Sequence, residues 1–66
     1  MLVLSEILLR SGDEILTFAV LKQTIQAMAI ATGQLHFQID IEPPAYHDRP
    51  EDWYEQLEQA FMEAGR

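Results

Sequence analysis

The sequence predicts a small α+β domain, in the order strand or short helix, long central helix, amphipathic strand and acidic amphipathic C-terminal helix, completed by dimerisation. Three observations support this fold class. An apolar helical pattern lies between Ser11 and Gly33, apolar and polar residues alternate over 35–42, and a second helical pattern covers 51–64. A chain of 66 residues is expected to form one domain, residues 1–66.

Both periodicity and end signals predict the central helix. Ser11 and Glu14 have the spacing of a capping box, and Gly33 can close a helix in the left-handed conformation, so a helix from about Gly12 to Thr32 is expected. One side of this helix carries a wide stripe at spacings of three and four, made of Ile15, Phe18, Leu21, Ile25, Met28, Ala29 and Thr32. The opposite side is also apolar, with Leu16, Val20, Ala27 and Ala31. In so short a chain, burial of both sides favours a cover supplied by another chain.

Strand remains the alternative for the start of this region, because ILTFAVL is rich in β-compatible residues and residues 10–13 could form a hairpin turn. Residues 1–10, MLVLSEILLR, form either a strand or a short helix, which periodicity alone cannot separate. Over 35–42 the strict alternation predicts a strand with one buried face, formed by Leu35, Phe37, Ile39 and Ile41. Its partner is either residues 2–9, across a parallel crossover, or the same strand of a second copy.

The proline-rich segment 43–50 predicts a stiff connector that cannot continue a strand. Its Pro43-Pro44-Ala45-Tyr46 matches a pattern that aromatic-lined grooves recognise, but a linker with Tyr46 packed on the core is favoured. For the C-terminal helix, 51–64, Asp48 and Glu51 suggest a second capping box, Pro50 suits the first turn and Gly65 stands beyond the end.

The C-terminal helix is predicted to be amphipathic, with aromatic residues on its apolar face. That face holds Trp53, Leu57, Ala60, Phe61 and Ala64, and the opposite face holds Glu51, Glu55, Glu58 and Met62. The apolar face can close over the chain's own core or lie in the groove of another protein. The first interpretation is favoured, because the chain has a single Trp.

Size and charge point to a partner. A chain of this length buries only about 60% of its surface on folding, and the absence of cysteine excludes disulfides and thiolate metal sites. Of the net charge of −7, residues 1–39 contribute −1, from three acidic and two basic residues, and residues 40–66 contribute −6, from eight acidic and two basic residues. Direct nucleic-acid binding is therefore disfavoured, and a basic protein partner is expected. Without a signal-like N-terminus or a membrane-length apolar run, a cytoplasmic location is expected.

Catalytic patterns are weak. The glycines Gly12, Gly33 and Gly65 are all placed as helix punctuation rather than in a phosphate loop, and Ser11 is expected to cap a helix. His36, Asp40 and His47 could contribute to a metal site, but their spacing fits no specific motif, and solvated histidines are the simpler interpretation. No catalytic residue, cofactor or metal is therefore predicted.

Two segments resemble parts of a known family. GQLHFQIDIEP followed by RPEDWYEQLEQAFMEAG is similar to the closing strand and acidic, Trp-bearing tail of small bacterial antitoxins of the swapped-hairpin type, and LSEILLRSGDEI resembles their GDE-containing turn. The resemblance implies an inhibitor that binds a protein partner. The chain departs from the family in its helical segment 22–32 and lacks the basic N-terminal DNA-binding surface.

The sequence thus predicts a small acidic, non-catalytic, regulatory or adaptor protein, inhibitor- or antitoxin-like, that forms a homodimer and engages a basic protein. The residues expected to bind the partner are Trp53, Tyr54, Leu57, Phe61, Glu51, Glu55 and Glu58. Two alternatives remain: a structural homo-oligomer without a foreign partner, and an inhibitor whose carboxylates imitate nucleic-acid phosphates.

Overall fold

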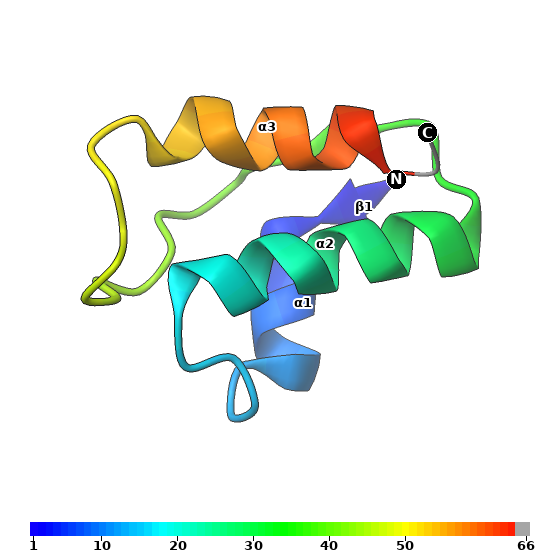
Figure 1. The fold of residues 1–66 in the computed structure, drawn as a ribbon. Helices are drawn as coiled ribbons and strands as arrows, with labels where there is room; N and C mark the ends of the chain where they lie inside the picture. Colours follow the sequence, from blue (N-terminus) through cyan, green and yellow to red (C-terminus); the bar gives the residue numbers. More distant parts are fainter. Residues whose placement is uncertain (65–66) are drawn as a thin grey trace.

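The computed structural model describes residues 1–64, which form a mixed α+β arrangement. The elements are β1 (Leu2–Val3), α1 (Leu4–Ser11), α2 (Phe18–Thr32), β2 (Phe37–Gln38) and α3 (Trp53–Glu63). β1 and β2 pair in parallel, with Leu2 opposite Phe37 and Val3 opposite Gln38. Figure 1 shows α2 and α3 running side by side in the same direction, with β1 and α1 behind α2.

The predicted central helix is confirmed for Phe18–Thr32 and wrong for residues 12–17. Ser11 does not cap it: Ser11 is the last residue of α1, and the next residue, Gly12, donates its N–H to the Leu8 carbonyl at 2.9 Å. The side chain that caps α2 locally is Thr17, whose Oγ1 accepts the N–H of Val20 at 3.1 Å. Gly33 ends α2 at φ 64°, as predicted.

The two alternatives for residues 1–10 are both realised, because the chain turns from strand to helix at Leu4. This early turn also explains why the strand expected over 35–42 pairs only at Phe37 and Gln38: its partner strand ends at Val3. The predicted alternation is retained in part, since Phe37 and Ile39 pack against the core while Leu35 and Ile41 are exposed.

Two aspartates from the second half of the chain cap two helices of the first half. Asp40 accepts the main-chain N–H of Ser5 on Oδ1 at 3.0 Å and the Ser5 hydroxyl on Oδ2 at 2.6 Å, at the start of α1. Asp48 accepts the N–H groups of Phe18 and Ala19, at 2.7 and 3.1 Å, at the start of α2. Asp48 therefore caps α2. The prediction that Asp48 forms a capping box with Glu51 at the start of the C-terminal helix is wrong.

The core is enclosed by three helices: the inner side of α2 faces α1 and α3. Its largest fully buried aliphatic side chains are Leu4, Ile7, Leu21, Ile25 and Leu57. Most of the apolar stripe predicted on α2 faces this core; Met28 is half-buried, and Thr32, at the end of the stripe, is exposed.

Leu57→Ala is expected to lower the free energy of unfolding by about 2–5 kcal/mol, because it removes a side chain that is 0% exposed and leaves a cavity. Leu9→Ala is the matched control: the same atoms are removed from a side chain that is 86% exposed, so a change within about 0.5 kcal/mol is expected. Urea denaturation of both variants measures the difference. Equal losses would contradict the placement of Leu57.

Acid is expected to destabilise the fold through the two aspartate caps. The Ser5 hydroxyl bond is the main cause that lowers the pKa of Asp40 below 3.8, and the Phe18 N–H bond is the main cause that lowers the pKa of Asp48. A carboxyl group whose pKa is lower in the folded state contributes stability that is fully present above about pH 5 and lost as pH falls through the folded value. We expect Asp48→Asn to flatten the fall in unfolding free energy between about pH 5 and pH 2. Asp13→Asn serves as the control, and an unchanged slope in Asp48→Asn would contradict the cap.

Candidate functional site

The apolar residues predicted to bind a partner lie on the inner side of α3. Leu57 is fully buried, and Trp53 and Phe61 are half-buried against the core. The Phe61 ring stacks on Phe37, with centroids 5.3 Å apart and planes at 25°. The apolar face of α3 thus closes over the chain's own core, which is the interpretation that the sequence favoured. Leu57 is not available as a surface anchor in this fold.

Arg49 holds the connector close to the start of α3. Its Nη1 donates to the Pro43 carbonyl at 2.6 Å and to Glu42 Oε2 at 3.2 Å, and its guanidinium carbon lies 5.9 Å from the centre of the Trp53 ring. Tyr46, in the same connector, packs on the core as predicted, and burial together with the charge of Asp48 raises its pKa. Tyr46, the tyrosine of the PPxY pattern, is therefore half-buried and is not a fully exposed side chain.

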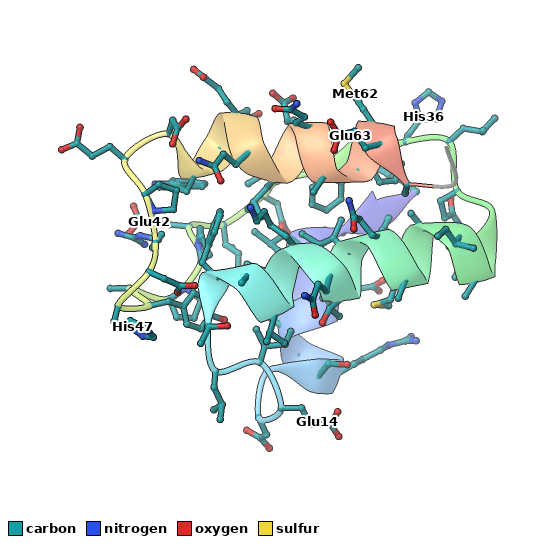
Figure 2. The ribbon with its side chains drawn as sticks, in the orientation of Figure 1. Glu14, His36, Glu42, His47, Met62 and Glu63 are labelled. Carbon is teal, nitrogen blue, oxygen red and sulfur yellow. The ribbon has the colours of Figure 1, made fainter. Side chains whose placement is uncertain are left out.

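The other predicted binding residues lie on the outer side of α3 and, in the case of Glu51, in the turn just before it; we call this surface the acidic face of α3. It consists of Glu51, Tyr54, Glu55, Glu58 and Met62, all of them exposed, with Tyr54 48% and Met62 64% exposed. Figure 2 shows Met62 pointing away from the body of the molecule. Among residues 1–64 the single ion pair joins Arg49 to Glu42, so no carboxylate of the acidic face has a basic partner within the described chain.

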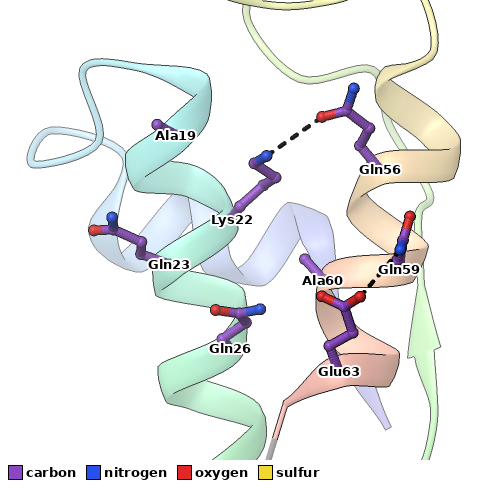
Figure 3. Close-up of a pocket in the computed structure, with 8 residues that line it drawn as sticks. All are labelled: Ala19, Lys22, Gln23, Gln26, Gln56, Gln59, Ala60 and Glu63. Atoms are coloured by element: carbon purple, nitrogen blue, oxygen red, sulfur yellow. Dashed lines mark hydrogen bonds between the residues drawn. The ribbon is translucent and has the colours of Figure 1, made fainter.

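A polar groove of about 430 Å³ separates the exposed edges of α2 and α3 (Figure 3). Its lining residues are Ala19, Lys22, Gln23, Gln26, Gln56, Gln59, Ala60 and Glu63. Lys22 Nζ donates to Gln56 Oε1 at 3.3 Å, and Gln59 Nε2 donates to Glu63 Oε1 at 3.0 Å. The groove offers amide, ammonium and carboxylate groups, but no hydroxyl, thiol or imidazole group lines it. It therefore supplies hydrogen-bonding positions and two groups of opposite charge, Lys22 and Glu63.

The histidine-based metal hypothesis is not supported by the geometry. Figure 2 shows His36 beside the C-terminal end of α3 and His47 at the opposite end of the molecule. Asp40, the third member, is engaged by Ser5. Over residues 1–64, no group of three or more His, Asp or Glu side chains is arranged to hold a metal ion.

Sequence reasoning missed two features of these surfaces. Met62 was placed on the outer side of the helix but not counted as a contact residue, although it lies four positions after Glu58. The groove was also missed, although polar residues at Lys22 and Gln26, and at Gln56 and Gln59, follow the helical spacing of three and four along both helices. Such polar pairs beside an apolar stripe indicate an interhelical edge, but only when the pairing of the helices is known.

Comparisons with known proteins provide no family assignment: no family model, no curated protein and no solved structure matches this chain. The segment that resembles the GDE-containing turn of the antitoxins, Gly12–Glu14, forms a turn, which here connects α1 and α2. In the part of the chain that the structure describes, none of the helices has the length and apolar character needed to cross a membrane.

Proposed function

We propose that this chain is a small acidic, non-catalytic interaction module. It acts as a regulator of a basic protein, or as an adaptor for it, and binds this protein through the acidic face of α3. The partner contacts would come from Glu51, Glu55 and Glu58, with the exposed Tyr54 and Met62 as apolar contacts beside them. Trp53, Leu57 and Phe61 act indirectly, because they hold α3 on the core and so fix which side of the helix is presented.

The observation that carries this proposal is the lack of internal partners for the acidic face. Asp40 and Asp48 are engaged in helix caps, and Glu42 is paired with Arg49. The carboxylates of the acidic face form neither an ion pair nor a hydrogen bond with another side chain within residues 1–64, and they are exposed. A row of unpaired carboxylates steers basic partners by long-range attraction and repels acidic ones.

We also propose that the module is a homodimer. This second proposal is favoured by the apolar side chains that one copy leaves in water, among them Leu16 and Ile30, 75% and 61% exposed. If no basic partner exists, the same observation favours the alternative function, a structural homo-oligomer component. A single monomeric species in sedimentation velocity at every concentration tested would contradict the homodimer.

The test of partner binding is affinity capture from the source cell with a matched pair of variants. Glu55→Gln/Glu58→Gln removes two charges from the acidic face, and Glu6→Gln/Glu14→Gln removes two charges from exposed positions elsewhere. We expect the unchanged chain and the control pair to retain a basic protein that the acidic-face variant loses, because the attraction depends on where the charges lie. The retained amount should fall as salt is raised from 0.05 to 0.5 M, since the distance over which exposed charges interact shrinks from above about 10 Å to between about 3 and 8 Å.

Equal capture by both variants would contradict a role for the acidic face. Displacement of the captured protein by double-stranded DNA would select the phosphate-imitating version of the proposal, in which the partner's basic surface normally binds nucleic acid. Capture that survives added DNA would leave the acidic-face proposal intact and exclude that version.

A further inference from the structure

We propose that the polar groove between α2 and α3 binds a short peptide with free ends, about three residues long. The carboxylate of the peptide would lie at Lys22, its ammonium group at Glu63, and its main-chain amides along the glutamine side chains between them. The groove lies between two helices (Figure 3), whereas the acidic face lies on the outer side of α3, so this inference does not depend on the proposed basic partner.

The groove has a floor of small residues and walls of polar ones. Its lining residues follow the spacing i, i+3, i+4, i+7 on both helices, beginning at Ala19 in α2 and at Gln56 in α3. Ala60 is 5% exposed and lines the groove, so a short buried side chain forms part of its floor. The polar walls include Gln26, Gln56 and Gln59, whose side-chain amides carry both donors and acceptors, as the main chain of a peptide does.

Lys22 supplies a position for the carboxylate of the peptide. Its half-buried side chain has no ion pair within residues 1–64, where the single pair joins Arg49 to Glu42. Its Nζ donates once, to Gln56 Oε1 at 3.3 Å, and an ammonium group has three N–H donors. Gln56 is held in place by Asp52, whose Oδ1 accepts from Gln56 Nε2 at 2.9 Å. Two donors of a partly desolvated cation are therefore open to an anionic group of a ligand.

Glu63 supplies the opposite charge at the other end of the groove (Figure 3). Its Oε1 accepts from Gln59 Nε2 at 3.0 Å, and its other oxygen, Oε2, has no partner among the described side chains. The dipole of α3 has the same direction, because Gln56 lies in the first turn of that helix and Glu63 is its last residue. A helix dipole favours an anion near its N-terminal end and a cation near its C-terminal end. The two side chains and the helix therefore orient a zwitterion in one direction.

The distance between the two charged ends selects the length of the ligand. Gln56, which binds Lys22, and Glu63 are two helical turns apart, about 10 Å along the axis of α3. An extended peptide spans at most about 3.3–3.6 Å per residue, so about three residues bridge this distance, whereas the charges of a single amino acid lie too close together. The net charge of −7 disfavours a purely anionic ligand and Lys22 disfavours a purely cationic one, so a zwitterion is the class that both ends accept.

The experiment is a titration of the isotope-labelled chain with trialanine, followed through the amide NMR signals. We expect saturable shifts centred on Lys22, Gln26, Gln56 and Gln59. The dissociation constant should be on the order of 1 mM, since a ligand of this size gains only a modest free energy per atom. Trialanine with both ends chemically blocked should bind at least about fivefold more weakly, because it lacks both charges. Free alanine, which cannot reach both ends of the groove, should bind more weakly than trialanine as well.

Two variants with matched controls test the two ends of the groove. Lys22→Gln removes the positive charge of the groove, and Arg10→Gln removes a positive charge from an exposed position on α1. Glu63→Gln and Glu58→Gln form the corresponding acidic pair, because Glu58 lies outside the groove on the acidic face. We expect each groove variant to weaken trialanine binding by about fivefold or more, and each control to stay within about twofold of the unchanged chain.

The outcomes decide between peptides and other ligands. The absence of a saturable shift in the groove amides, equal binding of the end-blocked peptide, or equal binding by groove and control variants would overturn the proposal. ω-Aminooctanoate has the same number of bonds between its charged groups as trialanine but no amide, and we expect it to bind more weakly. Equal affinity for the two ligands would overturn the assignment of the site to peptides. The comparisons between ligands use the unchanged chain, so they test the proposal even where a substitution lowers stability.

Discussion

The capping of α1 and α2 by aspartates from the second half of the chain is the constraint on which the rest of the structure depends. The first N–H groups of a helix have no partner within the helix and must find one elsewhere. Here the partner is Asp40 for Ser5 of α1, 35 residues away in the sequence, and Asp48 for Phe18 of α2, 30 residues away. The negative carboxylates also suit the positive ends of the two helix dipoles. Because Asp48 joins the connector to the start of α2, it helps to set α3 beside α2, so that the core closes.

These caps divide the acidic residues of the chain into two groups with different roles. Asp40 and Asp48 cap helices and Glu42 pairs with Arg49, whereas the carboxylates of the acidic face are exposed and have no such partner within residues 1–64. Apolar residues are divided in the same way: one side of α2 builds the core, and the other side is exposed. The fold thus presents an acidic surface and an uncharged apolar surface on different helices. The acidic surface is the physical basis for proposing a partner of opposite charge.

The sequence was informative wherever a pattern depends on neighbouring residues. The stripe from Phe18 to Ala29, the second apolar side at Val20 and Ala27 and the inward Leu57 all follow from helical spacing. The left-handed Gly33 follows from the preference for glycine just after a helix. Helix starts were predicted less well. Ser11 and Glu14 have the spacing of a capping box that is not formed, the local cap of α2 at Thr17 was not recognised, and the aspartate caps come from residues 30 and 35 positions away. Local reading likewise could not show that α1 begins at Leu4 and so limits the sheet to two residue pairs. The groove depends on the pairing of α2 with α3, which no local pattern contains.

Amide hydrogen exchange measured residue by residue tests the capping constraint most directly, and α3 supplies an internal reference because Asp52 makes no side-chain cap there. First-turn amides without a partner exchange readily. The account predicts that the amides of Ser5, Phe18 and Ala19 are protected well above those of Trp53 and Tyr54, after correction for intrinsic rates. Equally fast exchange at all five amides would show that the aspartates do not hold the two helices, and would contradict the account.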